Sequence, residues 1–249
     1  MCKKFLIPLL VSILIPCGNS LFAVDTQGMQ RGNRIMDPAP IGGKAAVAVS
    51  PDLPVNIAKT AVLIMDYQND IVSMFPENER ASLLDRASTI LRESRQAHIP
   101  VIYIVVRFRD GYPEINPRNK LFSSLKESKR LREGTAGAEI HTTVTPQPGD
   151  IVVTKRRVGA FSTTDLDTIL HANNINTLAV FGLSTSGVVL STVRWAADMD
   201  YSLIVISDAC ADRDAEVNRV LMDKVFPWQA TVVTTQEFLT AIQGKNTGR

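Results

Sequence analysis

Cysteine is scarce in this sequence. Only Cys2, Cys17 and Cys210 occur among 249 residues, and the first two lie in an N-terminal segment with the pattern of a signal peptide. Once that segment is removed, Cys210 has no other cysteine with which to form an internal disulfide. The fold must therefore be stabilised by a hydrophobic core, and 45% of the residues are hydrophobic, which suits one sizeable domain.

Histidine is equally rare, and its spacing argues against the common metal sites. His98, His141 and His171 have no metal-ligand spacing, and none has a neighbouring cysteine or a cluster of carboxylates. We therefore expect no bound metal, and nothing else in the sequence indicates a cofactor.

A strong excess of positive charge is also lacking. The formal net charge is +2, and removal of Lys3 and Lys4 with the N-terminal segment lowers it by two, to zero. Domains that bind nucleic acid commonly present a strongly basic surface. Nucleic acid is therefore not expected as a partner, and a small-molecule substrate or ligand is the remaining expectation.

Residues 1–23 have the three parts of a secretory signal peptide. Two lysines precede the apolar run FLIPLLVSILIP, and small and polar residues then lead to Ala23. The run is too short for a typical membrane span, so cleavage would release a periplasmic or extracellular protein that has no membrane attachment. An alternative is lipid attachment at Cys17, which Pro16 disfavours because a small residue is usual at that place.

The next segment lacks regular periodicity. Residues 24–56 are rich in glycine, proline and alanine, as in DPAPIGG, and show neither helical nor strand spacing. Such composition predicts an extended or mobile N-terminal arm. The folded domain is expected to comprise residues 57–249, with its packed part beginning near Lys59.

Short apolar runs alternate with helical stretches in the rest of the chain. The runs AVLIMD, VIYIVV, DIVVTK, TLAVFG, SLIVIS and ATVVT consist largely of valine, isoleucine and leucine, and helix-spaced segments such as ERASLLDRASTILRESRQAH lie between them. Continuous apolar strands with intervening helices indicate a parallel sheet covered on both faces. The sequence therefore predicts a single doubly wound α/β domain.

Polar residues end three of the predicted strands. Asp66 ends AVLIMD, Lys155 ends DIVVTK, and a turn from Gly182 to Gly187 follows TLAVFG. The carboxyl ends of parallel strands share one crevice, so these groups could meet there, and the helix after the turn would offer free amides to an anion. Each group also has a structural explanation, as a cap, a surface lysine or a helix N-cap.

One long segment interrupts the alternation of strands and helices. Residues 107–136 contain prolines, glycines and many charges, and they follow the VIYIVV strand. A loop of this length in a compact domain is usually functional or mobile. We expect it to lie over the crevice as a cover.

Taken in order, these segments resemble the isochorismatase-like cysteine hydrolase family over about residues 59–243. The resemblance lies in TAVLIMDYQND, in PQPGDIVVTKRRVGAF with Thr164 and Leu166 after it, and in GLSTSGVVLSTVRWAADMDYSLIVISDACAD. It implies a Rossmann-like sheet of about six mainly parallel strands with helices on both faces, and homodimers or higher homo-oligomers. It also implies a catalytic Asp, Lys and Cys.

Asp66 and Lys155 match two members of that trio, but Val188 occupies the position of the nucleophilic cysteine. The family further implies a cis peptide between Leu183 and Ser184 and an oxyanion hole formed by the amides of Ser184 and Val188. The sequence departs again at Gly159, where the family has serine, and it lacks the paired histidines of metal-bearing nicotinamidases. Nicotinamidase activity is therefore not expected.

The candidate substrate-binding residues surround this turn or are aromatic. Aromatic side chains at such places also commonly belong to the core. The candidates are Ser184, Thr185, Gly187, Phe161 and Trp195.

The missing thiol limits the chemistry. Valine has no lone pair, so covalent amide hydrolysis by the cysteine route is closed. Hydrolysis of a vinyl ether needs only a proton donor and water, and Asp66 as general acid with Lys155 beside it would suffice. The sequence thus predicts an isochorismatase-family hydrolase that acts on a small molecule by acid catalysis.

Two alternatives stay open. Ser184 or Ser186 could replace the thiol, although each is displaced from the cysteine position and needs a nearby base. The chain could also be a catalytically inactive family member that binds a small carboxylated or planar ligand through Lys155 and the turn.

Overall fold

Six parallel strands form one sheet in the computed structural model, which describes residue 53 and residues 55–244. They lie in the order β3-β2-β1-β4-β5-β6, and every neighbouring pair is parallel. This confirms the predicted doubly wound α/β sheet. The strands are β1 (Thr60–Met65), β2 (Val101–Val106), β3 (Ile151–Lys155), β4 (Thr177–Gly182), β5 (Ser202–Ile206) and β6 (Thr231–Val233).

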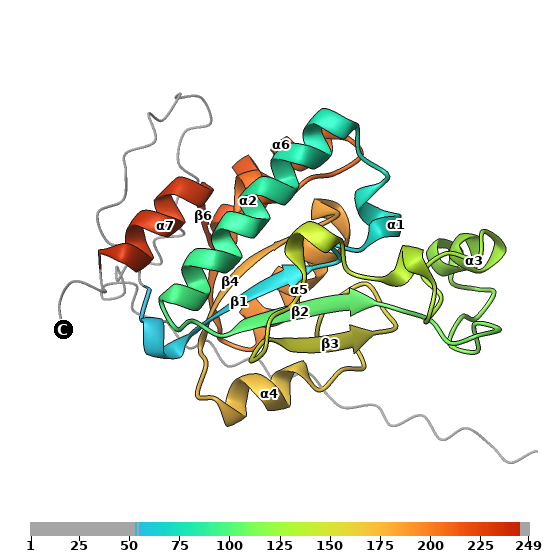
Figure 1. Cartoon of the computed structure of the whole chain (residues 1–249), viewed down its shortest axis with the longest axis horizontal. Helices are drawn as coiled ribbons and strands as arrows, with labels where there is room; N and C mark the ends of the chain where they lie inside the picture. The colour runs from blue at the N-terminus through green and yellow to red at the C-terminus, as the bar shows by residue number, and fades with distance from the viewer. Residues whose placement is uncertain (1–52, 54, 245–249) are drawn as a thin grey trace, which may run out of the picture. The chain divides into compact units, whose positions relative to one another are not determined.

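The central strands are apolar because both of their faces are covered. Every residue of β1, β2 and β4 is buried, whereas the edge strand β3 alternates and leaves Val152 exposed. Helices α2 and α7 cover one face of the sheet and α4 and α5 the other (Figure 1). The helices are α1 (Asn69–Val72), α2 (Glu77–Gln96), α3 (Lys120–Glu127), α4 (Leu166–Ala172), α5 (Leu190–Asp198), α6 (Ala215–Val220) and α7 (Thr235–Gln243).

Short helical turns complete the connections. Two of them are π-helical, η4 (Thr185–Val189) and η6 (Leu221–Val225). The remaining five are 3₁₀ turns: η1 (Ile57–Lys59), η2 (Ala136–Ala138), η3 (Thr142–Val144), η5 (Ser207–Ala209) and η7 (Phe226–Trp228). Among the described residues, no helix combines the length and apolarity needed to cross a membrane.

The segment 107–136 is more ordered than a loop. It contains α3, which the Asn119 side chain caps by accepting a hydrogen bond from the Phe122 amide. The Phe108 ring lies 5.8 Å from the Tyr112 ring and 5.3 Å from the Phe122 ring, measured between centroids. These three aromatic side chains form a small core under α3, which extends from the end of β2 (Figure 1).

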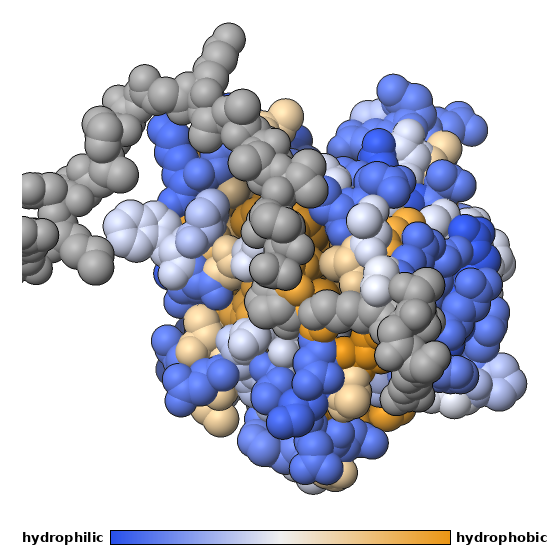
Figure 2. Space-filling model, turned by 90° about the vertical axis from the view of Figure 1, so that its left-hand side faces the viewer, coloured by the Kyte–Doolittle hydropathy of each residue, from blue (hydrophilic) through white to orange (hydrophobic). Residues whose placement is uncertain are grey.

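The packed part of the chain reaches further back than Lys59. Leu53 is 8% exposed and Val55 is fully buried, and both belong to the hydrophobic core. The predicted signal peptide (1–23) and residues 24–52 of the predicted arm lie outside the described residues, so those predictions stay predictions. Figure 2 shows the end of the sheet at which the strands begin, where apolar side chains are visible among polar ones.

Candidate active site

Asp66 follows β1 at the carboxyl edge of the sheet. Its amide donates to the Ile104 carbonyl at 2.8 Å, and its backbone then turns to a φ of 60°. Such left-handed backbone is uncommon outside glycine, occurs more often for Asp and Asn than for other residues, and collects at functional sites. The residue is only 5% exposed.

Lys155 is the last residue of β3 and reaches Asp66 over the end of β2. In the sheet register Lys155 lies beside Val106 of β2, and β2 lies between β3 and β1. The long lysine side chain spans this strand, and its Nζ donates to Asp66 Oδ2 at 2.8 Å and to the Arg157 carbonyl at 3.2 Å. The structure therefore brings together the acid and the lysine that the sequence singled out.

The two oxygens of the Asp66 carboxyl group have different surroundings. Oδ2 accepts the bond from Lys155, whereas Oδ1 is buried and has no hydrogen-bond partner among the described residues. Burial raises the pKa of Asp66 above its ordinary value, although the charge and the hydrogen bond of Lys155 lower it in part. The proton of a neutral Asp66 therefore has a position on Oδ1.

Val188 lies where the sequence placed it, in the turn after β4. Gly182 ends β4 opposite Met65, the residue before Asp66. A Cβ at Gly182 would come within 2.8 Å of Met65 and 3.3 Å of Val188 Cγ1, so the glycine permits both contacts. The Val188 side chain is 2% exposed. An apolar, buried group thus occupies the position beside the ends of β1 and β4.

The turn itself has the expected backbone. The Leu183–Ser184 peptide bond is cis, as the family resemblance implies. The Ser184 carbonyl accepts from the amides of Gly187 at 3.2 Å and Val189 at 3.4 Å, and η4 begins at Thr185. The Ser184 Oγ would lie 2.9 Å from a Cβ at Gly187, so a larger residue would displace this hydroxyl.

Side chains and backbone from the next strand connection hold the turn in place. The Ser186 amide donates to Asp212 Oδ2 at 2.7 Å, and the Thr185 hydroxyl donates to Asn218 Oδ1 at 2.6 Å. The Thr185 amide also donates to the Ala211 carbonyl at 2.9 Å. Asp212 ends the segment GLSTSGVVLSTVRWAADMDYSLIVISDACAD but is not among the predicted site residues, and the local pattern does not distinguish Asn218 from an ordinary helix residue.

The two aromatic candidates lie elsewhere. The Phe161 ring packs 6.0 Å from the Tyr201 ring, which precedes β5 at the opposite edge of the sheet. Trp195 is 50% exposed on the outer side of α5, whose buried residues face the sheet. Neither ring belongs to the contacts that surround Asp66 and Lys155, so their proposed role as substrate-binding residues gains no support from their position.

Gln68 is a buried site residue that sequence reasoning missed. Its Nε2 donates to the carbonyls of Val106 at 2.9 Å and Ala138 at 2.7 Å, and its Oε1 accepts from the Val106 amide at 2.7 Å. These bonds fix the end of β2, over which Lys155 passes, to the segment after β1. The only sequence signal was its position in TAVLIMDYQND, two residues after Asp66.

An ion network joins segment 107–136 to the end of β3. Glu114 accepts from Arg109 at 2.6 Å and from Arg156 at 3.2 Å, and Arg156 also pairs with Glu133. Burial alone would raise the pKa of Glu114, but hydrogen bonds from backbone amides and from the two arginines lower it below its ordinary value. The segment is thus joined to Arg156, the residue after Lys155, and its role as a cover stays a prediction.

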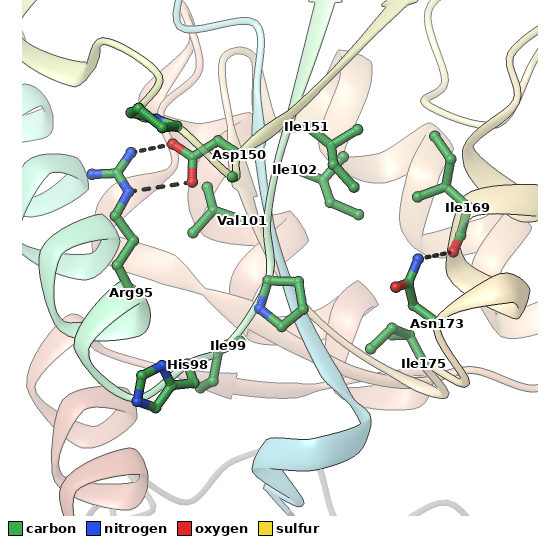
Figure 3. Close-up of a pocket in the computed structure, with 13 residues that line it drawn as sticks. Arg95, His98, Ile99, Val101, Ile102, Asp150, Ile151, Ile169, Asn173 and Ile175 are labelled. Carbon is green, nitrogen blue, oxygen red and sulfur yellow. Dashed lines mark hydrogen bonds and ion pairs between the residues drawn. The ribbon is translucent and has the colours of Figure 1, made fainter.

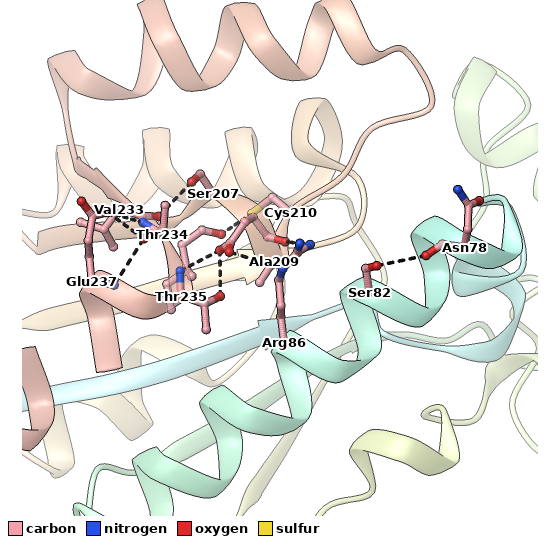
Figure 4. A network of polar contacts seen from close by, with 12 residues as sticks. Asn78, Ser82, Arg86, Ser207, Ala209, Cys210, Val233, Thr234, Thr235 and Glu237 are labelled. Atoms are coloured by element: carbon pink, nitrogen blue, oxygen red, sulfur yellow. Dashed lines mark hydrogen bonds and ion pairs between the residues drawn. The ribbon is translucent and has the colours of Figure 1, made fainter. Parts of the chain in front are cut away.

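The end of β5 is fixed by a separate polar network (Figure 4). Asp208 accepts from the amide and hydroxyl of Thr235 at 2.7 and 2.8 Å, and its carbonyl accepts from Arg86 at 3.0 Å. Cys210 lies within this region, and burial raises the pKa of its thiol to about 12. A thiol with so high a pKa is not ionised at neutral pH and cannot supply the missing nucleophile.

Two cavities lie at opposite ends of the strands, one at the end where the strands begin and one at the carboxyl end. One of about 400 Å³ lies where β2 and β3 begin, and it contains the ion pair of Arg95 and Asp150 with an Nη2 to Oδ2 distance of 2.6 Å (Figure 3). Another of about 360 Å³ is lined in part by Asp212 and Asn218, the residues that hold the turn. The second cavity therefore borders the candidate site, whereas the first does not.

Comparison with known proteins places this geometry in context. The model of the isochorismatase domain matches residues 60–237. The uncharacterized isochorismatase family protein YwoC of Bacillus subtilis is 30% identical over 197 residues, which cover 77% of this chain and 98% of YwoC. The ureidoacrylate amidohydrolase RutB of Caulobacter vibrioides is 29% identical, covering 75% of this chain and 92% of RutB.

A solved structure has the same architecture. The cysteine hydrolase from Pseudomonas syringae pv. phaseolicola superimposes with a TM-score of 0.71 at 26% sequence identity. The superposition covers 78% of this chain and 96% of that chain. The likeness therefore extends over most of this chain and nearly all of the other.

Proposed function

Because the chain belongs to the isochorismatase family, we propose that it is a small-molecule hydrolase that uses Asp66 as a general acid and needs no cysteine nucleophile. The observation that supports this most directly is the state of the Asp66 carboxyl group. Its Oδ2 is held by Lys155, its Oδ1 has no hydrogen-bond partner among the described residues, and burial raises its pKa. An acid catalyst needs a proton at a fixed place near neutral pH.

Hydrolysis of an enol ether is the reaction that fits this group. Asp66 Oδ1 would transfer its proton to the terminal carbon of the double bond, leaving a positive charge shared by the adjacent carbon and the ether oxygen. Water would add to that carbon, and the resulting hemiketal would break into a ketone and an alcohol. The proton released by the water would return to the Asp66 carboxylate, so the enzyme ends as it began.

Lys155 has a positioning part in this scheme. Its ammonium group fixes Oδ2 and thereby orients the carboxyl group, and it is itself 1% exposed. After proton transfer the carboxylate is negative, and the nearby positive charge stabilises it. The lysine thus favours the transfer without taking up or releasing a proton.

Amide hydrolysis, the activity named for RutB, is not extended to this chain. The Val188 side chain offers no atom that could attack a carbonyl carbon. Neither Ser184 nor Ser186 donates its hydroxyl hydrogen to a base among the described residues, so neither is activated as a nucleophile. The proposed activity therefore excludes the covalent route.

The proposal is tested by turnover of matched substrates. The purified protein without its predicted signal peptide is assayed on aryl enol ethers, aryl amides and N-carbamoyl compounds, beside a Val188→Cys variant. We expect the natural protein to hydrolyse an enol ether and to leave the amides intact. Replacement of both Ser184 and Ser186 by alanine should leave that activity within a few-fold of the natural level.

A contrary result has a defined meaning. If the natural protein is inactive on every substrate and Val188→Cys alone hydrolyses amides, then the scaffold is intact but has lost its chemistry. The chain would then be a binding protein for a small ligand, the alternative that the apolar Val188 side chain permits.

A further inference from the structure

Arg157 has an unusual position among the arginines of the molecule. Eight described arginines are half-buried, and six of them form an ion pair with a carboxylate. The two exceptions are Arg80 on α2 and Arg157 just after β3. A partly buried guanidinium without an anionic partner has lost part of its hydration and gained no opposite charge, so it favours an anionic ligand.

The position of Arg157 is next to the catalytic pair. Its carbonyl accepts the 3.2 Å bond from Lys155 Nζ. Val158 packs against the turn, because its Cγ1 would lie 3.9 Å from a Cβ at Gly187, and Gly159 packs against α5, because a Cβ there would lie 3.3 Å from Ser191 Cβ. Arg157 is thus part of the segment that runs between the acid, the lysine and the η4 turn.

The guanidinium is only partly used by the protein. Its Nη1 donates to the carbonyls of Glu114 at 3.3 Å and Arg156 at 2.6 Å. Its Nε and Nη2 donate to no acceptor in the described part of the chain. These two nitrogens form one edge of the planar group, and such an edge matches the two oxygens of a carboxylate.

The neighbouring charged groups form no ion pair with Arg157 among the described residues. Lys155 is bound to Asp66 and is fully covered, so it cannot also bind an anion from solution. Glu114 Oε1 is held by Arg109 and Arg156, and Oε2, which is buried without a hydrogen-bond partner among the described residues, makes no ion pair with Arg157. Arg157 is therefore the cation of this segment that remains for a ligand.

We propose that Arg157 binds a carboxylate group of the substrate and so restricts the enzyme to carboxylated compounds. This inference rests on the proposed function, because it deepens the account of the same site. The guanidinium would fix the carboxylate through Nε and Nη2, and the double bond of the substrate would then lie toward Asp66 Oδ1. Arg157 is a specificity residue in this scheme and takes no part in proton transfer.

The test measures binding and turnover separately. Benzoate and its neutral analogue benzamide are titrated by calorimetry into the natural protein, Arg157→Gln, Arg157→Lys and the control Arg118→Gln, which changes an exposed arginine of segment 107–136. We expect Arg157→Gln to weaken benzoate binding at least about tenfold and to leave benzamide binding unchanged, because hydrogen bonds to a charged group are among the strongest in proteins. Arg157→Lys should keep part of the benzoate affinity, and Arg118→Gln all of it.

The outcomes separate this inference from the proposed function. In an Asp66→Asn variant benzoate should still bind, so failure of acid catalysis would leave the carboxylate site standing. With a carboxylated enol ether, Arg157→Gln should raise KM at least tenfold and change kcat little. The inference is overturned if the natural protein binds benzoate no better than benzamide, or if Arg157→Gln, folded by circular dichroism, binds benzoate as well as the natural protein does.

Discussion

At the scale of single residues, the chemistry depends on how Asp66 is held. Its Oδ2 is bound to Lys155, and its Oδ1 is buried without a partner among the described residues. The surroundings therefore stabilise the neutral acid and the carboxylate to different extents. The unpartnered oxygen favours the neutral acid, and the lysine favours the carboxylate. Burial is the larger influence, and the pKa of Asp66 is raised.

This balance predicts a pH dependence with a definite sign. The acid form of Asp66 is the active one, so kcat/KM should be highest at low pH and fall as the pH rises through the pKa. An ordinary aspartate has a pKa of about 4. Because the pKa of Asp66 is raised, the falling limb should lie at a higher pH than that. A pH profile of kcat/KM between pH 4 and about 9 measures it. A limb at or below the ordinary value would contradict the assignment.

Removal of the lysine charge should move this limb upward. Lys155→Met removes the influence that lowers the pKa of Asp66, so the falling limb should shift to higher pH. The same profile recorded for the variant gives the direction. A shift to lower pH, or none, would show that Lys155 does not act on Asp66 as described.

Gln68 is expected to stabilise the site rather than react in it. Gln68→Leu would leave the amide and the carbonyl of Val106 buried without the partner that Gln68 supplies. It would also remove one of the two donors to the Ala138 carbonyl, which keeps its bond from Arg107 Nε. We expect a loss of roughly 2–5 kcal/mol in the free energy of unfolding, measured by urea titration. The exposed Gln236→Leu on α7 is the control and should change it by less than about 0.5 kcal/mol.

The sequence identifies the two reactive groups, Asp66 and Lys155, better than the residues that surround them. Asp66 and Lys155 end apolar runs, so their meeting at the carboxyl edge follows from parallel topology. Gln68 and Arg157 carry no such signal, because their partners are backbone carbonyls and amides far away in the chain. Such bonds depend on three-dimensional position and not on any local pattern of residues.

At the scale of elements, segment 107–136 has the structure that is hardest to predict from the sequence. Ion pairs connect it to the end of β3. The sequence predicts a long loop, whereas the structure has α3 and an aromatic cluster within it. Leu121, Phe122 and Leu125 of α3 do have helical spacing, but this short pattern lies among many charged residues and is not recognised as a helix from the sequence. Within the segment, Glu114 forms an ion pair with Arg156, the residue after Lys155.

Weakening this network should loosen the segment. Glu114→Gln keeps the shape of the side chain but removes the charge that holds Arg109 and Arg156. We expect amide hydrogen exchange within residues 107–136 to become at least several-fold faster, while the strands of the sheet are unaffected. Glu127→Gln, at the exposed end of α3, is the matched control. Equal protection in both variants would mean that the ion network does not hold the segment.

At the scale of the whole molecule, the packed domain includes described residues before the expected boundary. Leu53 and Val55 are buried in the core although they precede the expected boundary near Lys59. The free energy of unfolding can be compared between a chain that begins at residue 53 and one that begins at residue 57. A chain that begins at residue 57 should lose about 3–5 kcal/mol, because two apolar side chains leave the core. Equal stability of the two truncated chains in urea would contradict this.

Some properties of the whole protein remain predictions from the sequence alone. Cleavage after Ala23, export, and assembly into homodimers or larger oligomers belong to this group. The fold, by contrast, follows from six apolar runs whose order in the sheet agrees with a doubly wound topology. A sheet whose strands are buried on both faces is the feature that single-sequence patterns indicate most clearly.

The central claim is that Asp66 supplies a proton, and its most direct test is the turnover of a carboxylated enol ether by the natural protein and by Asp66→Asn. The side-chain amide of asparagine cannot act as a proton donor in place of the carboxyl group, so kcat should fall by at least about 100-fold. The thermal unfolding transition of the variant should remain cooperative, which shows that it is folded. If Asp66→Asn keeps kcat within a few-fold of the natural protein, the account of acid catalysis is wrong.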